Sequence, residues 1–226
     1  MHIGTPGFII SGMEHVTSQL TDEDRRALIA LGAATLGESG AMALSPRIRP
    51  VWKGATFAGP ALTAACAAGD NLALHAAVAR AEPGTVLAVS FAGDSVRGYW
   101  GEVLTTAAEA AGIVALVIDG EVRDVAAIEQ HGFPVFARGV ALRGATKLGP
   151  GSVGTEIVLG DVVVRAGDWL LGDADGVVAI RPEDLAKCLA AASSRAEKEA
   201  RFFAELRGGA TTVQLLNLDV TSVENS

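Results

Sequence analysis

The middle of the chain alternates short apolar runs with segments of helical periodicity. The apolar runs have the length of buried strands, and the segments between them place apolar residues on one side of a helix. In chain order, the pattern predicts a strand at 55–66, a helix at 71–81, a strand at 86–91, a helix at 101–111, a strand at 114–118, a helix at 125–131 and a strand at 135–137. This alternation is typical of an α/β fold with parallel strand pairing.

The pattern changes toward both ends of the chain. Thr21 and Asp24 predict the capped start of a helix, and a second helix is expected around 33–39. After Gly139 the apolar runs are short and are separated by turn residues without a helix between them, which indicates antiparallel or mixed strands. Residues 182–208 predict one long helix. Its charged second half is compatible with packing on a neighbouring subunit or with a solvated surface.

Composition predicts a single globular domain over residues 1–226. Half of the residues are hydrophobic and only 5% are aromatic, so the core is expected to consist mainly of Val, Leu, Ile and Ala. The formal net charge is −8 and the basic residues are scattered, which argues against a nucleic-acid partner. The longest uncharged stretch, 54–69, is broken by Gly and Pro, so we expect no membrane span and a cytoplasmic protein.

Several familiar site motifs are missing. The sequence has neither a Walker-type phosphate loop nor a strand-loop-helix GxGxxG, and the glycine-rich segment 149–154 precedes β structure, which predicts a turn. Asp173 and Asp175 lack the remaining ligands of a calcium loop and predict a β-turn. Cys66 and Cys188 lie outside any CxxC spacing and are expected to be buried and reduced.

Polar residues at strand ends and helix starts are the best candidates for chemistry. Asp124 follows a strand and precedes a helix, so it could bind a divalent cation or simply cap the helix. Arg123 could grip a substrate carboxylate or lie at the surface. Glu102 begins a helix whose free N–H groups favour anions, and it could equally be a surface carboxylate. His75 either lines the same site or is structural.

The arrangement of Glu102, twenty intervening residues and then Arg123-Asp124 resembles a known signature. It is similar to that of the class II pyruvate aldolases, in particular the 4-hydroxy-4-methyl-2-oxoglutarate / 4-carboxy-4-hydroxy-2-oxoadipate aldolases. These belong to the superfamily that includes the regulator of ribonuclease activity A. The similar segments, which together cover most of residues 20–207, are 69–78, 98–124, 132–139 and 172–180.

The resemblance implies a fold and an assembly. The family fold is α/β, an α-β-β-α sandwich with mixed sheets, here with a long C-terminal helix. The family assembles as homo-oligomers, trimers or hexamers, with the active site at the subunit interface. This would explain the charged helix at 182–208.

The resemblance also implies the role of each site residue. Asp124 would bind Mg²⁺ or Mn²⁺ directly, while Glu102 and, from an adjacent subunit, Glu199 would hold the metal through water. Arg123 would neutralise the ketone or enolate oxygen and help to orient a catalytic water. The backbone N–H groups that would bind the substrate carboxylate belong to Gly101, Glu102, Val103 and Leu104. Candidates for a supporting layer are Asn71 and His75.

The resemblance has one departure and one discriminating feature. Characterised aldolases carry Asp where this chain has Glu102, so the role of this carboxylate is open. The Arg123-Asp124 pair argues against the ribonuclease-regulator branch, which lacks it.

The expected function is a metal-dependent lyase. It would cleave a 4-hydroxy-2-oxo acid to pyruvate and an oxo compound through a metal-stabilised enolate, with oxaloacetate decarboxylation as a side activity. The expected partner is therefore a small 2-oxo acid. The alternatives are a non-catalytic regulator that binds a protein, and a related 2-oxo acid decarboxylase without aldolase activity.

Overall fold

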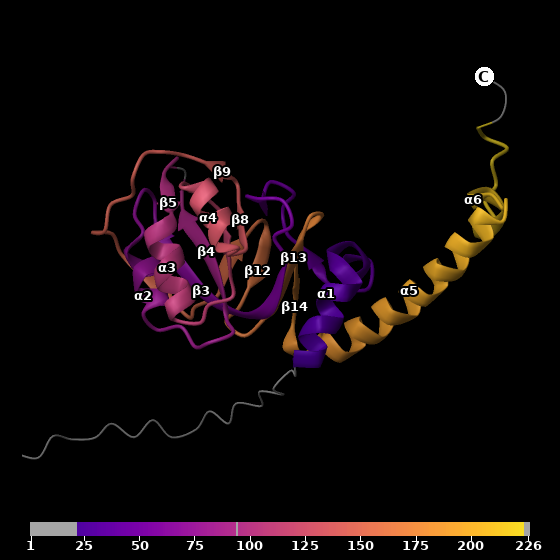
Figure 1. The fold of residues 1–226 in the computed structure, drawn as a ribbon, viewed down its shortest axis with the longest axis horizontal. Coiled ribbons are helices and arrows are strands. Elements are labelled where there is room, and N and C mark those ends of the chain that lie inside the picture. The colour runs from indigo at the N-terminus through magenta and orange to yellow at the C-terminus, as the bar shows by residue number, and fades with distance from the viewer. Residues whose placement is uncertain (1–21, 94, 224–226) are drawn as a thin grey trace, which may run out of the picture.

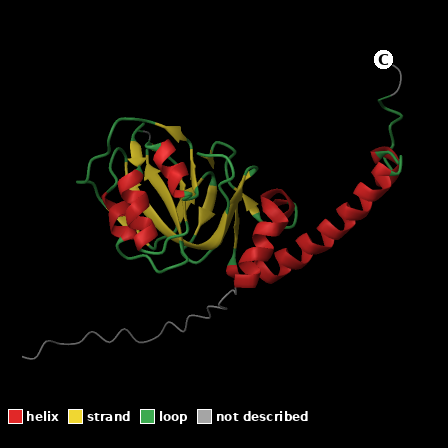
Figure 2. Ribbon diagram, in the orientation of Figure 1, coloured by secondary structure: helices red, strands yellow, loops and turns green. Residues whose placement is uncertain are grey.

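The computed structural model describes residues 22–93 and 95–223, and Thr21 of the expected capping pair lies outside them. The helices are α1 (Asp22–Gly37), α2 (Leu72–Val78), α3 (Glu102–Ala110), α4 (Val125–His131), α5 (Leu185–Arg207), preceded by the 3-10 turn η1 (Pro182–Asp184), and α6 (Thr212–Leu216). The strands are β1 (Met42–Ala43), β2 (Arg49–Pro50), β3 (Phe57–Ala67), β4 (Val86–Ala92), β5 (Gly98–Trp100), β6 (Ala115–Ile118), β7 (Glu121–Val122), β8 (Val135–Ala137), β9 (Gly139–Val140), β10 (Gly151–Val153), β11 (Ile157–Leu159), β12 (Val162–Val164), β13 (Trp169–Asp173) and β14 (Gly176–Ile180). Figure 1 labels most of these elements, and Figure 2 distinguishes helices from strands.

The main sheet is mixed, with strand order β1-β14-β13-β3-β4-β6-β8-β2 and β10 added to β3. Strands β3, β4, β6 and β8 pair in parallel, as the alternation of strands and helices predicts. The long strand β3 joins the two halves of the sheet: residues 57–60 pair antiparallel with β13, and residues 61–67 pair parallel with β4. The β13-β14 hairpin places Ala174 and Asp175 in its turn, which confirms the turn that the sequence predicts there.

Alternating side chains sort the structure into layers. In β4, Leu87 and Val89 pack against α2, α3 and α4, whereas Val86 and Ala88 face an inner core shared with β13 and β14. The opposite face of β13 and β14 packs on α1 and α5. Figure 1 shows α2, α3 and α4 on one side of the strands and α1 and α5 on the other. The expected α-β-β-α sandwich with a mixed sheet and a long C-terminal helix is therefore confirmed.

The two terminal helical regions differ in how they pack. Gly32 (φ 77°) interrupts α1, so the expected second helix around 33–39 forms the second half of this element. In α5, Leu185, Cys188 and Ala192 are buried, but no later residue of the helix is. Figure 1 shows α5 projecting away from the body of the molecule. Cys66 and Cys188 are free and buried, as expected. Among the described residues, no helix combines the length and apolarity needed to span a membrane.

Candidate functional site

A pocket of about 260 Å³ lies where β5, β7, α2 and α3 meet the loop that follows β9. Strands β5, β7 and β9 form a small parallel sheet in which Trp100 pairs with Val122. Parallel strands end at the same edge, so Gly101 and the Arg123-Asp124 pair become neighbours. The backbone N–H of Arg123 donates to the carbonyl of Trp100 over 2.8 Å, which fixes this edge.

Asp124 has an unusual backbone and an unusual partner. It occupies the N-cap position of α4 in the left-handed region (φ 57°), but its side chain does not cap α4. Its Oδ2 instead accepts a hydrogen bond of 3.1 Å from the backbone N–H of Glu102, at the start of α3. A left-handed non-glycine residue costs about 1 kcal/mol or more, and such residues tend to cluster at functional sites. The carboxylate is 42% exposed and faces the pocket.

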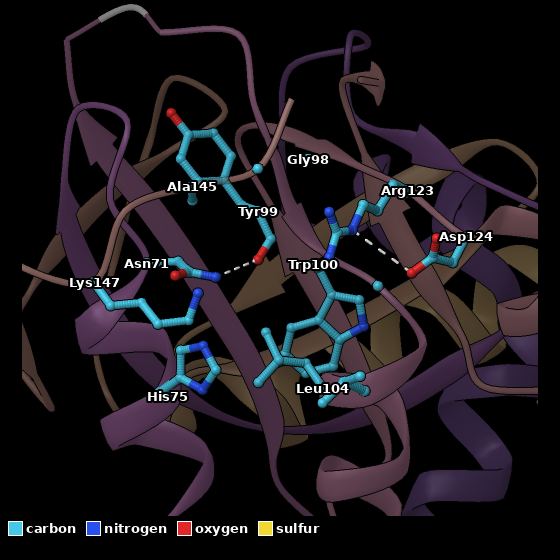
Figure 3. A pocket seen from close by; sticks show the side chains of 13 residues that line it. Asn71, His75, Gly98, Tyr99, Trp100, Leu104, Arg123, Asp124, Ala145 and Lys147 are labelled. Carbon is cyan, nitrogen blue, oxygen red and sulfur yellow. Dashed lines mark hydrogen bonds and ion pairs between the residues drawn. The ribbon is translucent and has the colours of Figure 1, made fainter. Parts of the chain in front are cut away.

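Arg123 reaches into the same pocket. Its Nε lies 3.7 Å from Asp124 Oδ2, and 45% of its side chain is exposed. Figure 3 shows the guanidinium group extending from the strand end toward the middle of the pocket. The pair therefore presents a carboxylate and a guanidinium side by side in the pocket.

The start of α3 supplies backbone donors beside this pair. The N–H of Thr105 makes the first bond within α3, to the carbonyl of Gly101, and the N–H of Glu102 is held by Asp124. The N–H groups of Val103 and Leu104, two residues that line the pocket, have no acceptor within the helix. They are well placed to bind an anion.

The Glu102 side chain takes a different direction from its backbone. Its Oε1 lies 3.8 Å from Nε2 of His131, which also contacts Glu109, and the side chain is 57% exposed. It is not among the groups that line the pocket. A role for this carboxylate in holding a metal through water stays a prediction.

Gly101 provides the space that the Asp124 carboxylate occupies. A Cβ at position 101 would overlap Asp124 Oδ2 and would lie 3.1 Å from Cγ of Arg123. Any side chain there would push the two residues away from the start of α3.

Replacing Gly101 with Ala should therefore reduce activity more than stability. We expect about a 100-fold lower kcat/KM, because a displacement of about 1 Å at a reacting centre costs about that much. The free energy of unfolding should fall by about 1–2 kcal/mol. The matched control is Gly37→Ala, whose added Cβ meets nothing closer than 3.9 Å. Steady-state kinetics and urea denaturation of both variants test this, and a fully active Gly101→Ala protein would contradict it.

The opposite wall of the pocket carries Asn71, His75 and Lys147. Asn71 Nδ2 donates to the carbonyl of Tyr99 over 2.8 Å, while its Oδ1 is buried without a partner. His75 Nε2 is also buried without a partner. Burial, and then the positive charge of Lys147, lower the pKa of His75, so its imidazole is neutral at neutral pH. Asn71 and His75 both line the pocket, which is one of the two alternatives that the sequence left open for His75.

Asp70 fastens the loop that carries Lys147. Its buried carboxylate accepts hydrogen bonds from the N–H of Leu72 (2.8 Å), the hydroxyl of Thr146 (2.7 Å) and the N–H of Leu148 (2.6 Å). Burial raises the pKa of Asp70, but these hydrogen bonds outweigh it and hold the pKa well below its ordinary value of 3.8. Both residues that flank Lys147 are therefore tied to the start of α2.

The lowered pKa predicts a pH-dependent contribution of Asp70 to stability. The stabilisation by Asp70 is complete above the ordinary pKa and declines as the pH falls below it. In that range the carboxyl group binds a proton in the unfolded chain but stays ionised in the folded chain. Asp70→Asn should lower the free energy of unfolding by about 2 kcal/mol at pH 7. The difference in this free energy between the wild type and the variant should become smaller toward pH 2.5. Urea denaturation at several pH values measures this. An equal difference at both ends of the range would contradict it.

Glu199 lies away from the pocket within one chain. It is on the projecting part of α5, where its Oε1 is 2.9 Å from Nε of Arg195, and Arg195 also pairs with Glu38. Only a neighbouring subunit could bring such a residue to the site, so its expected role stays a prediction.

The chemistry of Asp124 fits a hard divalent cation. Its second carboxylate oxygen carries no hydrogen bond to α4, and the pocket beside it is open. In residues 22–93 and 95–223, no group of three or more His, Cys, Asp or Glu side chains is arranged so that it could hold a metal ion by itself. Mg²⁺ typically takes one or two protein carboxylates and completes its shell with water and substrate, so a single carboxylate from this chain suffices for such a site.

Two features of the pocket were not predicted from the sequence. Lys147 follows the last predicted strand of the α/β half by ten residues and has no local motif, so only the fold brings it to the site. Tyr99 lies between Gly98 and Trp100 and is buried, and its hydroxyl accepts a hydrogen bond from Gly69 N over 3.1 Å. Neither position carries a sequence signal that would have identified it.

Comparisons with known proteins place the chain in a family. A family model described as RraA-like, Aldolase/RraA, matches residues 17–179. A Halalkalibacterium halodurans protein named "Putative 4-hydroxy-4-methyl-2-oxoglutarate aldolase" is 38% identical over 137 residues, which are 61% of this chain and 65% of that protein. The matched part thus spans less than two thirds of this relative.

Solved structures agree on the fold. An uncharacterized protein from Pseudomonas syringae superposes with a TM-score of 0.78 at 23% identity, covering 92% of this chain and 98% of the other. The RNA-processing inhibitor RraA from Thermus thermophilus gives a TM-score of 0.60 at 25% identity, covering 66% and 93% of the two chains. Because the family model matches most of the chain, the protein belongs to the RraA-like aldolase/RraA family.

Proposed function

We propose that the protein is a divalent-metal-dependent lyase that cleaves a 4-hydroxy-2-oxo acid, of the 4-hydroxy-4-methyl-2-oxoglutarate type, to pyruvate and an oxo compound. One observation carries the proposal: Arg123 and Asp124 line the same pocket as Val103 and Leu104, two residues in the first turn of α3. The relative named as an aldolase supports the same activity. Oxaloacetate decarboxylation would be a side activity, since it passes through the same pyruvate enolate.

The proposed metal is Mg²⁺ or Mn²⁺, held by Asp124, with Glu102 and a neighbouring subunit's copy of Glu199 acting through water. When bound, the cation would supply Lewis-acid charge for the electrons released by C–C cleavage. The remaining steps depend on residues of this chain.

Each of these residues has a separable task. The N–H groups of Val103 and Leu104 bind the substrate's C1 carboxylate and orient the 2-oxo group. The Arg123 guanidinium donates to the ketone oxygen and stabilises the negative charge that develops there as the C3–C4 bond breaks. A water oriented by Arg123 accepts the proton of the C4 hydroxyl and later returns one to C3 of the enolate.

The proposal includes an oligomer, either a trimer or a hexamer. The second half of α5, which projects from the body without a buried residue, supports this, because it offers a surface for a neighbouring subunit. Light scattering measures the assembly, and a monomeric protein that is fully active would exclude a role for Glu199 from another subunit.

A second candidate function is that of a non-catalytic regulator. The likeness to the RNA-processing inhibitor from Thermus thermophilus supports it. This candidate requires neither a divalent cation nor the Arg123-Asp124 pair. A third candidate, a 2-oxo acid decarboxylase without aldolase activity, shares the site and differs only in its substrate.

One experiment separates the three candidates. Purified protein with Mg²⁺ or Mn²⁺ is given 4-hydroxy-4-methyl-2-oxoglutarate or oxaloacetate, and pyruvate is measured with lactate dehydrogenase. The lyase releases pyruvate from both and loses activity with EDTA. Release from oxaloacetate alone supports the decarboxylase, and no release together with no Mn²⁺ binding by calorimetry supports the regulator. Release that survives EDTA excludes the metal-dependent mechanism.

A further inference from the structure

The pocket has two chemically different walls, and the proposed function uses only one of them. Arg123, Asp124 and the start of α3 form the wall assigned to the 2-oxo acid end of the substrate. The facing wall, formed by Asn71, His75 and Lys147, comes from α2 and from the loop after β9 (Figure 3). A substrate that is cleaved between C3 and C4 must place its far half somewhere in the same pocket.

Asn71 presents an unused acceptor on this wall. The residue is only 5% exposed, and its bond to the Tyr99 carbonyl requires Nδ2 on that side, which leaves Oδ1 as the buried acceptor of this pocket-lining residue. Oδ1 has no partner. A buried polar atom left unpaired costs about 1–3 kcal/mol, so such an atom in a pocket indicates a ligand that donates a hydrogen bond.

Lys147 presents an unused cation beside it. Across the described ranges, no hydrogen bond or ion pair occupies its ammonium group. The loop segment that carries this exposed lysine is held at the pocket, because the Asp70 carboxylate binds Thr146 and Leu148 on either side of it. Figure 3 shows the lysine side chain extending toward Asn71 and His75. His75 is neutral, so Lys147 is the only positive charge among the side chains of this wall.

We propose that Lys147 and Asn71 are specificity residues for the half of the substrate that leaves as the oxo product. Lys147 pairs with a carboxylate on C4, and Asn71 Oδ1 accepts a hydrogen bond from the C4 hydroxyl. This rests on the proposed function, because it assumes that the 2-oxo acid end lies against Arg123 and Asp124. Lys147 and Asn71 together select a substrate whose C4 carries both a carboxylate and a hydroxyl. Lys147 alone would select only the carboxylate.

Equilibrium binding tests the Lys147 assignment without turnover. 2-Oxoglutarate and 2-oxopentanoate share the 2-oxo acid end and differ in the far carboxylate. Calorimetry should show at least 10-fold tighter binding of 2-oxoglutarate to the wild-type protein. Lys147→Met should abolish this preference, whereas the control Lys53→Met, an exposed lysine outside the pocket, should keep it. Equal binding of both acids to the wild type, or an unchanged preference in Lys147→Met, overturns the assignment.

Kinetics test the same assignment during cleavage. Lys147→Met should lower kcat/KM for 4-hydroxy-4-methyl-2-oxoglutarate by about 30-fold, mainly through KM, as expected for one charge-assisted hydrogen bond. It should change kcat/KM for 4-hydroxy-2-oxopentanoate, which lacks the C4 carboxylate, by less than about threefold. Equal losses for both substrates overturn the inference. A wild type that releases no pyruvate but prefers 2-oxoglutarate refutes the proposed reaction and leaves the Lys147 carboxylate site supported.

Asn71→Leu tests the second contact. It removes the acceptor at similar size, together with the bond from Nδ2 to the Tyr99 carbonyl, so KM for the hydroxylated substrate should rise about 10-fold. The affinity for 2-oxoglutarate, which has no C4 hydroxyl, should stay within about threefold. If Asn71→Leu weakened the binding of the hydroxylated substrate and of 2-oxoglutarate alike, Asn71 would only support the pocket. That result would overturn its assignment as a hydroxyl acceptor.

Discussion

Asp124→Asn is expected to lower kcat for pyruvate release by about 1,000-fold or more while leaving the fold intact. The amide keeps the shape of the carboxylate and can still accept the hydrogen bond from Glu102 N, but it loses the negative charge that a divalent cation needs. Asn tolerates the left-handed backbone at this position as well as Asp does. The free energy of unfolding should therefore change by less than about 1 kcal/mol.

The control for Asp124→Asn has the same backbone conformation. Asp161, in the exposed turn between β11 and β12, is also left-handed (φ 67°) and lies outside the pocket. Asp161→Asn should keep wild-type kcat and Mn²⁺ affinity, both measured beside Asp124→Asn. An Asp124→Asn protein with undiminished activity, or with unchanged Mn²⁺ affinity by calorimetry, would contradict the metal assignment.

The repeating part of the fold could be predicted because its signal is local. The runs at 86–91, 114–118 and 135–137 are apolar on both faces, and the structure shows why: one face contacts the helices and the other the inner core. A strand that is buried on both faces appears in the sequence as a continuous apolar run, which can be recognised without knowing how the strand pairs with its neighbours. The helix expected at 125–131 has the predicted bounds because its end is also marked locally, by Gly132 in the left-handed conformation.

The strands that build the site could not be predicted in this way. Strands β5, β7 and β9 have two or three residues each, which is too short for any periodicity to be measured. These strands are defined by their pairing with one another and not by a pattern within each segment. The sequence therefore indicated Arg123 and Asp124 as a pair but not the edge that brings them beside Gly101.

The role of Asp124 shows the same limit at one residue. An Asp before a helix predicts a cap, and the structure places Asp124 at that position with its carboxylate turned to a different helix. The left-handed backbone that permits this turn has no signal in the sequence. Lys147 was likewise invisible, because Asp70 holds it in place from more than 70 residues away. The family resemblance carried by Glu102 and Arg123-Asp124 indicated the candidate site, but tertiary contacts determine what each atom can do.

Arg123→Lys is expected to lower kcat by about 100-fold to 1,000-fold, although the positive charge is kept. The guanidinium is a planar group with several donors that can serve the ketone oxygen while its Nε stays near Asp124, at 3.7 Å. A lysine side chain is shorter and ends in a single ammonium group, so it cannot contact the ketone oxygen and Asp124 at the same time. Loss of one preorganised donor to a developing oxyanion typically costs this much.

Two measurements distinguish this role of Arg123 from a structural one. Exchange of the pyruvate methyl protons with deuterium, followed by NMR, requires only enolate formation and should fall in parallel with kcat. Mn²⁺ affinity should stay within about threefold, because Asp124 is intact. The control Arg143→Lys changes an exposed arginine near the pocket whose side chain does not line it, and it should leave both quantities unchanged. If Arg123→Lys kept more than a tenth of wild-type kcat, or exchanged pyruvate protons at the wild-type rate, the charge developed during cleavage would have to be stabilised by a different group.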